Sequence, residues 1–326
     1  MTGSPAHGPL RIIGVDLGGT KLAVGVVDER MHVLSRTVGP TIVDSAEGCL
    51  ADIVTRIDAA FEGSGGADAI GVGAASTVDF ARGRLVVSTN LPLVDVPLRD
   101  VLRERYRVPV AVDNDATVAC IAEHRFGAGV GVDEMLMLTL GTGIGGGIVA
   151  NGRIYRGLSG AAAELGHMVV EADGRWCQGN CPNRGCLEAY ASGYGLELSA
   201  LEVAELKPDS PLGKARAAGR RLDGGLISEL ARAGDGDASL VVEATGEMLG
   251  VGLANLTNIF NPALIVIGGG VAELGERLLA PARRVLAGRA LAPQRDEVRV
   301  APARFGQEAG TVGAAALALT EYFPAA

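Results

Sequence analysis

The chain has 326 residues, more than the roughly 250 to 300 at which a single hydrophobic core usually splits, so we expect two lobes. Its 48% apolar and 21% charged residues are typical of a folded globular protein and exclude a disordered chain. The net charge of −9 disfavours non-specific attraction to nucleic acid or to an anionic membrane. Met1 to Pro9 lacks the features of a signal peptide, and no stretch approaches a membrane span, so a cytoplasmic protein is expected.

The first half begins with an apolar run, Leu10 to Val15, then a glycine turn at 16–21, and a β-rich stretch at 22–27. This order predicts strand, turn, strand. A helix is predicted after a cap at Ser45, and buried strands are predicted at 69–74 and 108–112. The second of these strands ends in Asp113-Asn114-Asp115 and leads into a predicted helix over 116–126.

The second half repeats this design, which predicts two similar halves. A strand at 135–140, a glycine turn at 141–147 and a strand to Ala150 are followed by Asn151-Gly152, a type I′ turn sequence. Residues 155–195 show little periodicity, and 200–260 are predicted to be helical, most regularly over 238–258. A third strand at 264–267 precedes a glycine turn, an amphipathic helix at 273–286 and an alanine-rich helix at 310–322, which we expect to pack on the first lobe.

Three glycine turns lie at predicted strand ends, where backbone N–H groups could approach phosphate oxygens without an intervening Cβ. None matches G-x-x-x-x-G-K-S/T or the Rossmann fingerprint, and one such turn alone is weak evidence because glycine hairpins are common. Three such glycine turns, each after a predicted strand, together predict a nucleotide-binding site. The candidate residues are Gly18, Gly19, Thr20, Lys21, Gly141, Thr142, Gly143, Gly268, Gly269 and Gly270.

Asp16 stands at the first of these turns, between two apolar strands. A carboxylate there suits Mg²⁺, held through water because this ion dehydrates reluctantly, with Lys21 as a nearby positive charge. The alternative is that Asp16 only forms the turn, which aspartate also favours.

Three of the five cysteines, Cys177, Cys181 and Cys186, fall within ten residues, a spacing more typical of a metal site than of a disulfide framework. With His167 they could complete a structural Cys₃His zinc site. The alternative is a set of free thiols. Cys49 and Cys120 lie in apolar, helix-like stretches and are expected to pack in the core.

The motifs together resemble the ROK sugar kinases, a bacterial glucokinase group within the superfamily of actin, hexokinase and heat-shock chaperone ATPases. The resemblance covers about residues 11 to 318 and rests on 16–21, Asn114-Asp115-Ala116, 141–147, Glu164-Leu165-Gly166-His167 and Gly185-Cys186-Leu187-Glu188. It implies an α/β fold with two ribonuclease-H-like, actin-like ATPase lobes, a cleft where sugar and ATP meet, and Gly268 to Gly270 near the adenosine. The expected small lobe comprises 1–113 and 308–326, and the large lobe comprises 114–307 with a zinc loop at about 167–188. A homo-oligomer, dimer or tetramer, is also implied.

The resemblance also assigns roles to individual residues. Asp115 aligns with the catalytic base and Asn114 with a sugar-binding asparagine, although position alone favours helix capping for both. Further sugar ligands are implied at Glu164, His167 and Glu188, and Asn90 is expected to join them. Without the resemblance, an isolated glutamate is usually only a solvated charge. Zinc on one nitrogen of His167 would orient the other nitrogen toward the sugar.

The expected reaction is ATP-dependent phosphorylation of a hexose, glucose first, with N-acetylmannosamine, N-acetylglucosamine, fructose and allose as alternatives and polyphosphate as another donor. Two departures leave the sugar open: 73–79 lacks the family's Pro-Gly pair, and no aromatic residue follows Asn90-Leu91. The family's cysteine motif is usually Cys-x-Cys-Gly-x-x-Gly-Cys, and three residues separate Cys177 from Cys181 here, so Cys177 is the least secure ligand.

Two other classes of protein compete with a kinase. Some relatives are sugar-responsive repressors, which implies a sugar sensor as an alternative, but those carry an N-terminal helix-turn-helix and only about ten residues precede the first predicted strand here. DNA binding is therefore not expected. An actin-like or chaperone-like ATPase shares the phosphate turns but has no use for the sugar-binding residues.

Overall fold

The computed structural model describes residues 9–88 and 90–324, so Thr89 and nearly all of the N-terminal stretch in which no signal peptide was found lie outside it. The chain forms two compact units. The first comprises Met1–Gly131, Ile154–Ala162 and Gln307–Ala326, and the second comprises Val132–Arg153 and Ala163–Gly306. Residues 115–126 thus belong to the first unit, whereas the sequence-based boundary lay before them, because this helix packs on the C-terminal helix of the first unit.

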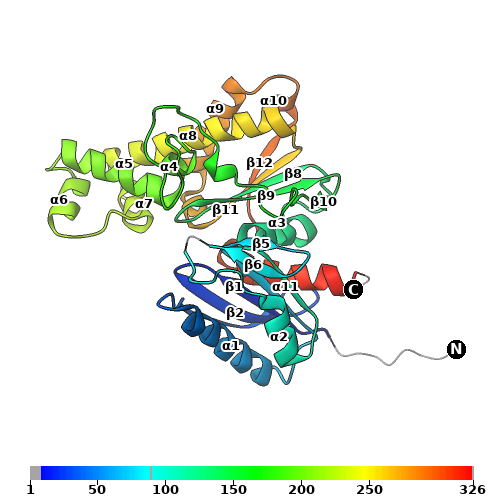
Figure 1. Cartoon of the computed structure of the whole chain (residues 1–326). Helices are drawn as coiled ribbons and strands as arrows, with labels where there is room; N and C mark the ends of the chain where they lie inside the picture. Colours follow the sequence, from blue (N-terminus) through cyan, green and yellow to red (C-terminus); the bar gives the residue numbers. More distant parts are fainter. Residues whose placement is uncertain (1–8, 89, 325–326) are drawn as a thin grey trace. The chain divides into compact units, whose positions relative to one another are not determined.

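The first unit is built on a five-stranded sheet in the order β3-β2-β1-β4-β7, with β1 antiparallel to β2 and parallel to β4. Strands β1 and β2 are the blue arrows of Figure 1. A two-stranded hairpin, β5-β6, stands beside it. The strands are β1 Ile12–Leu17, β2 Lys21–Val27, β3 Val33–Pro40, β4 Ala69–Ala74, β5 Thr77–Asp79, β6 Arg84–Val87 and β7 Val110–Asn114, and the helices are α1 Ala46–Gly63, α2 Leu98–Tyr106, α3 Asp115–Phe126 and α11 Ala309–Tyr322.

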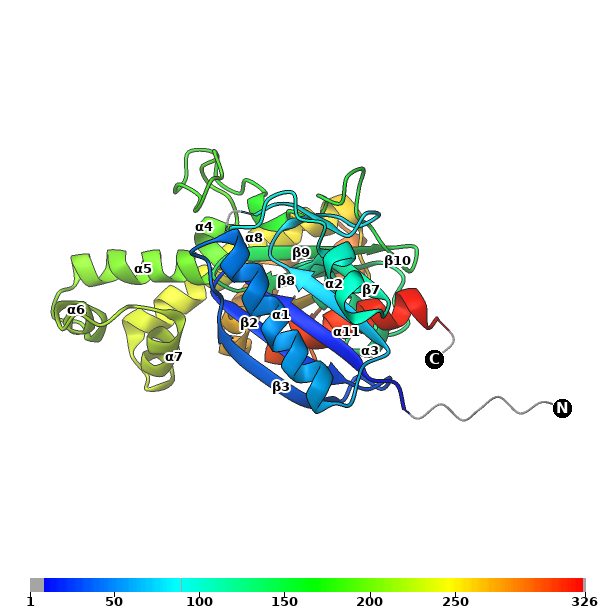
Figure 2. The ribbon, with the colours of Figure 1, turned by 60° about the horizontal axis from the view of Figure 1, so that its bottom comes forward.

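Successive side chains along β1 point to opposite faces of this sheet, and each face is covered by a different helix. Ile13 and Val15 of β1 share a core with Ile53 and Ile57 of α1, which lies across the sheet in Figure 2. Because successive side chains point to opposite faces, Gly14 and Asp16 face α11 instead. A Cβ on Gly14 would lie 2.0 Å from the Thr311 carbonyl oxygen, so α11 rests directly on the strand backbone. The prediction that the C-terminal helix packs on the first lobe is confirmed.

The second unit has a five-stranded sheet in the order β10-β9-β8-β11-β12. When the strands of each five-stranded sheet are counted in chain order, both sheets show the order third, second, first, fourth, fifth, which confirms the two similar halves. Its strands are β8 Met135–Leu140, β9 Ile144–Ala150, β10 Arg153–Ile154, β11 Leu264–Gly268 and β12 Arg299–Pro302, and its helices are α4 Glu188–Ala191, α5 Gly193–Leu206, α6 Pro211–Ala217, α7 Gly224–Arg232, α8 Gly236–Phe260, α9 Glu276–Arg289 and α10 Gln294–Glu297.

Most element predictions hold, and the differences have local causes. Ser45 caps α1 by accepting a hydrogen bond from the Gly48 N–H, and Asn151 and Gly152 have the positive φ values of a type I′ turn, 52° and 70°. The helix predicted from residue 273 is instead a 3₁₀ turn, Gly270–Leu274, followed by α9 from Glu276, because Gly275 adopts φ of 60° between them. Among the described residues, no helix is both long and apolar enough to cross a membrane.

Candidate active site and metal centre

Asp16 lies near the end of β1 on the face that α11 covers. Its carboxylate is 16% exposed and stands 3.7 Å from the Lys21 ammonium. Burial raises the pKa of Asp16, while the charges of Lys21 and Arg36 oppose that rise. A Cβ on Gly310, at the start of α11, would lie 2.3 Å from the carboxyl carbon, so only glycine leaves room for this side chain. The carboxylate of Asp16 is therefore confined between the Lys21 ammonium and the backbone of Gly310.

The turn after Asp16 closes on itself. The Gly18 N–H donates to the Lys21 carbonyl at 2.9 Å, and the Thr41 hydroxyl donates to the Gly18 carbonyl at 2.7 Å. A Cβ on Gly19 would lie 2.5 Å from the Cβ of Asn90, so the turn and the Asn90 segment are in contact. The structure thus brings Asp16, the glycine turn and Asn90 together within the first unit.

The Asp113-Asn114-Asp115 sequence spans the junction of β7 and α3. Asn114 is the N-cap, because its side-chain oxygen accepts from the Thr117 N–H. Asp115 is the first residue of α3, and its Oδ1 accepts from the Ala116 N–H at 2.9 Å and from the Asn114 side-chain amide at 3.0 Å. Asp113 is 2% exposed and ion-paired to Arg156 at 2.8 Å. The two aspartates therefore differ: Asp113 is buried and neutralised, whereas Asp115 is partly exposed at the helix start.

The second glycine turn, in the other unit, holds a buried carboxylate. The Gly141 N–H donates to the Gly143 carbonyl at 2.9 Å, which closes the turn much as in the first hairpin. The Ile144 N–H donates to Glu188 Oε2 at 2.7 Å, and a Cβ on Gly143 would lie 2.2 Å from the same oxygen. Glu188 is thus fixed under the turn, and a carboxylate keeps further lone pairs for a ligand hydroxyl.

The third glycine turn adjoins the second. Gly268 ends β11, Gly269 has φ of 88°, and Gly270 begins a 3₁₀ turn. A Cβ on Gly269 would lie 2.4 Å from the carbonyl oxygen of Leu140, the residue before Gly141. Two of the three predicted phosphate turns therefore meet in the second unit, as neighbouring strands of one sheet require.

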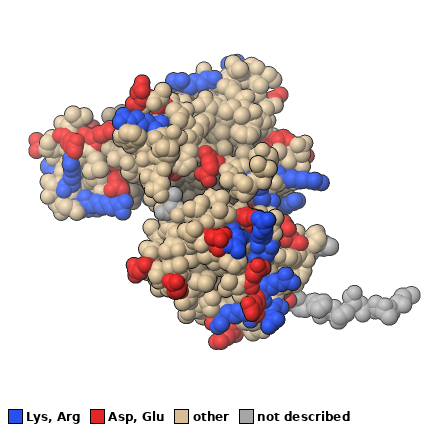
Figure 3. Space-filling view, in the orientation of Figure 1, with Lys and Arg blue, Asp and Glu red and all other residues tan. Residues whose placement is uncertain are grey.

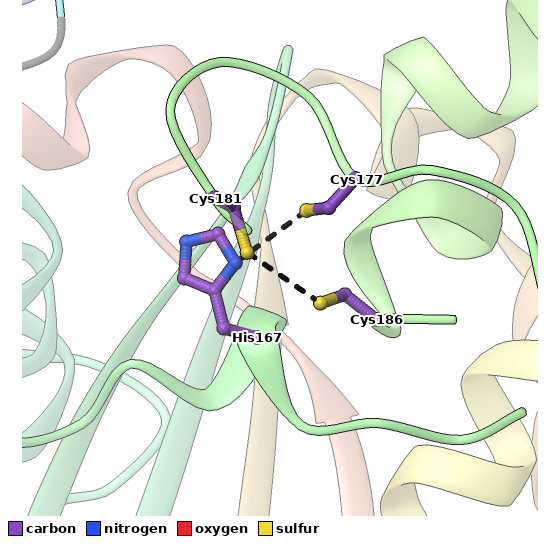
Figure 4. Close-up of side chains that lie close together, drawn as sticks. All are labelled: His167, Cys177, Cys181 and Cys186. Carbon is purple, nitrogen blue, oxygen red and sulfur yellow. Dashed lines mark hydrogen bonds between the residues drawn. The ribbon is translucent and has the colours of Figure 1, made fainter. Parts of the chain in front are cut away.

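Four side chains that could hold a metal ion converge in the second unit, as Figure 4 shows. Ligand atoms of His167, Cys177, Cys181 and Cys186 all lie within 4.8 Å of one another. Cys181 Sγ and Cys186 Sγ are 3.8 Å apart, and Cys177 Sγ is 3.6 Å from His167 Nδ1. A tetrahedron with zinc–sulfur bonds of about 2.3 Å has edges of about 3.8 Å, so the donor set fits zinc. Cys177 belongs to it despite its unusual spacing.

His167 presents its two nitrogens in different directions. Nδ1 faces Cys177, whereas Nε2 is 3.9 Å from Glu164 Oε2. The Glu164 side chain is 63% exposed, and Glu188 Oε1 is 3.6 Å from Cys177 Sγ. Of the expected sugar ligands of this unit, His167 thus belongs to the cysteine–histidine cluster, and Glu164 and Glu188 each lie next to one of its members. Cys49 and Cys120 are buried in the first unit, as expected for core cysteines.

Sequence reasoning missed several residues of these sites. Arg156 and Gly310 come from segments with no motif, and the chain shows no local signal for either. Asp113 could have been found, because a charged residue at the end of a buried strand needs a partner. Gln178, whose side-chain amide donates to the Thr142 carbonyl at 3.1 Å, lies between two of the predicted zinc ligands.

The profile of the ROK family matches residues 12–321. The chain belongs to the ROK family. A glucokinase from Thermotoga maritima is 36% identical to this ROK protein over 94% of the chain and 97% of its own length. A crystal structure of a ROK family glucokinase from Streptomyces griseus in complex with glucose and AMPPNP superimposes with a TM-score of 0.84 at 39% identity, covering 94% of this chain and 98% of that one.

A second class of relatives is also similar to this ROK protein. A putative xylose repressor from Caldicellulosiruptor is 30% identical over 95% of this chain and 78% of its own length. The expected two-lobe, actin-like ATPase fold is confirmed by the similarity to ROK glucokinase structures.

Proposed function

We propose that this protein is an ATP-dependent glucokinase, which transfers the γ-phosphoryl group of ATP to glucose and forms glucose 6-phosphate. The observation that carries the proposal is the similarity along nearly the whole chain to ROK glucokinases, one of them crystallised with glucose and an ATP analogue. The two units supply the chemistry this reaction needs: closed glycine turns for phosphates, a carboxylate for a magnesium ion, and carboxylate and imidazole groups for sugar hydroxyls.

In this proposal Asp115 accepts the proton of the attacking hydroxyl. Its partial exposure and its place at the start of α3 suit that task, whereas Asp113 is buried and already neutralised by Arg156. Phosphoryl transfer has a loose transition state, so the base mainly orients the nucleophile and needs no raised pKa. Asn114 and Asn90 in the first unit, and Glu164, His167 and Glu188 in the second, would bind sugar hydroxyls.

The nucleotide would be held by the three glycine turns, with Gly268 to Gly270 nearest the adenosine. Mg²⁺ neutralises phosphate charge when it is bound, and Asp16 would hold it, with Lys21 beside it. The Gly18 and Gly141 N–H groups are engaged inside their own turns, so their role is to shape the loops.

The zinc is structural in this proposal. Four protein donors, His167, Cys177, Cys181 and Cys186, would hold it and would leave no open position for a reactant. With Nδ1 of His167 on the metal, Nε2 is presented on the other side of the ring, toward Glu164, where a sugar hydroxyl would bind. The metal would thus shape the sugar site without contacting phosphate.

The proposed partners are a hexose and ATP, without nucleic acid or membrane, in a homo-oligomer, dimer or tetramer, in the cytoplasm. None of the five cysteines forms a disulfide, which suits a reducing compartment. Acidic and basic side chains are interspersed over the face seen in Figure 3, and the net charge is −9, which suits a protein that does not bind polyanions. The oligomer rests on the family resemblance, and light scattering would test it.

The test is ADP release from MgATP with glucose, mannose, fructose, allose and two N-acetylhexosamines, with polyphosphate as a second donor. Turnover strongly stimulated by glucose is expected. A response only to an N-acetylated sugar would keep the reaction and change the substrate, which would direct attention to residues 73–79. Sugar binding without turnover would instead favour a sugar sensor, the function that the similarity to repressors supports.

A further inference from the structure

We propose that Arg156 is a positioning residue that orients the nucleophile site, an inference that rests on the proposed kinase function. Its Nε donates to Asp113 Oδ2 at 2.8 Å, and its guanidinium carbon lies 3.8 Å from the centre of the Phe80 ring. Arg156 is thus held between a buried carboxylate and an aromatic face. All three residues belong to the first unit, although the chain on both sides of 154–162 belongs to the second.

The ion pair between Arg156 and Asp113 is connected to the proposed base, Asp115, by hydrogen bonds through Asn114. The second oxygen of Asp113, Oδ1, accepts from the backbone N–H of Asn114 at 2.9 Å. Asp113 therefore fixes the peptide bond between residues 113 and 114. The side-chain amide of Asn114 in turn donates to Asp115 Oδ1 at 3.0 Å. A rotation of this peptide would move the cap of α3 and the carboxylate of Asp115 together.

Phe80 connects Arg156 to a second part of the proposed sugar site. It follows β5, and the segment before β5 includes Ser76, whose carbonyl accepts from the Asn114 side-chain amide at 3.4 Å. The segment 154–162, which contains Arg156, also contacts the β5-β6 hairpin, because a Cβ on Gly160 would lie 2.1 Å from the Val78 carbonyl oxygen. Arg156 therefore ties the 76–80 segment to the Asp113–Asp115 junction from one side.

The positive charge of Arg156 is needed to stabilise the ionised carboxylate of Asp113, because that carboxylate is buried and not solvated by water. A buried carboxylate without a partner is strongly disfavoured, and removing one member of a buried ion pair leaves the other uncompensated. The carboxyl would then protonate or turn toward solvent, and either change alters its hydrogen bond to the Asn114 N–H. Arg156 acts on the reaction through this bond and does not contact the reacting atoms.

The test compares Arg156→Met with Arg156→Lys in steady-state kinetics of the full chain. Arg156→Met is expected to lower kcat by about 10- to 100-fold, since small displacements of reacting groups cost that much. KM for glucose should rise severalfold through Asn114, and KM for MgATP should not change. Arg156→Lys should recover part of kcat, because it restores the charge without the planar stacking on Phe80.

The matched control is Arg105→Met, which removes another ion pair of the same unit, between Arg105 and Asp58 at 2.6 Å. It should keep wild-type kcat. In addition, Asp113→Asn combined with Arg156→Met should be less impaired than the product of the two single effects, because both substitutions break one linkage.

Three outcomes are decisive. An Arg156→Met protein that melts at a lower temperature but keeps wild-type kcat per folded molecule would reduce Arg156 to a structural residue and overturn the inference. Equal loss in Arg156→Lys and Arg156→Met with additive effects in the double variant would overturn it as well. Absence of sugar-stimulated turnover in the wild-type protein would instead reject the proposed function, and with it the premise of this inference.

Discussion

At the scale of single residues, the two aspartates that flank Asn114 show how the environment separates chemically identical groups. Asp113 and Asp115 are two positions apart, yet one is buried against Arg156 and the other begins α3 with partial exposure. Burial raises the pKa of Asp113, and Arg156 opposes that rise. This difference in burial supports the choice of Asp115 as the proposed base.

Asp115→Asn is expected to lower kcat by about 100-fold or more, because the proton acceptor is lost. Glucose affinity should stay nearly unchanged, since asparagine keeps an oxygen that accepts from the Ala116 N–H. Steady-state kinetics and calorimetric glucose binding measure the two effects. Asp100→Asn, in the exposed first turn of α2, is the control and should be neutral. Near-normal turnover in Asp115→Asn would remove Asp115 from its proposed role.

Gly310→Ala tests Asp16 without changing it. The new Cβ would lie 2.3 to 2.6 Å from the carboxyl atoms of Asp16, so that side chain must rotate away. We expect kcat to fall about 10-fold or more and KM for MgATP to rise, because Asp16 would no longer meet the magnesium ion. Gly288→Ala in α9 has open space around it and serves as the control. Unchanged kinetics in Gly310→Ala would show that Asp16 needs no fixed position.

At the scale of elements, the contact of α11 with the first sheet depends on glycines that bring backbones together. Gly14 in β1 and Gly71 in β4 lie on the same face, and their absent side chains leave room for the carbonyls of Thr311 and Ala314. The C-terminal helix α11 therefore packs directly on β1 and β4, which come from the N-terminal part of the chain. This contact also places Gly310 against Asp16.

Gly71→Ala should destabilise the protein by about 3 kcal/mol or more. Its Cβ would lie 1.7 Å from the Ala314 carbonyl oxygen, a backbone atom that moves only if α11 moves. Chemical denaturation monitored by circular dichroism measures the change. Gly63→Ala, at the last residue of α1 with open space around it, should be nearly neutral. If both variants denature alike, the close approach of α11 to β4 does not exist in solution.

At the scale of the whole molecule, the proposed zinc site would link stability to the proposed sugar site. We expect about one zinc per chain by elemental analysis, and a closed site of this kind can contribute on the order of 10 kcal/mol to ordering its loop. Chelation should lower the melting temperature and weaken glucose binding together, because His167 belongs to both sites in the proposal.

Cys186→Ala should lose the zinc and glucose binding together, as its sulfur is one of four donors. The matched control is Cys49→Ala, which removes a buried thiol from the other unit and should keep the zinc. A metal-free wild-type preparation with full activity would contradict the structural role of zinc.

The sequence by itself determined the local elements and the residue types of the site. Strand–turn–strand hairpins, the cap at Ser45, the Asn151-Gly152 turn and the cysteine cluster could all be predicted, because periodicity, capping and turn chemistry act between near neighbours. The family resemblance supplied the proposed roles of Asp115, Asn114, Glu164 and Glu188. Position in the sequence indicated that Asn114 would cap α3, which the structure confirms, but nothing indicated that Glu188 would accept from the Ile144 N–H.

Only the tertiary structure decided the contacts between residues far apart in the chain. The pairing of Asp113 with Arg156, the fit of Gly310 over Asp16 and the place of Cys177 beside His167 follow from strand order, a returning segment and loop closure, which no local pattern encodes. The physical reason is that burial sets the cost of an unpaired charge or an added Cβ. Whether a residue is buried depends on which distant elements pack against it.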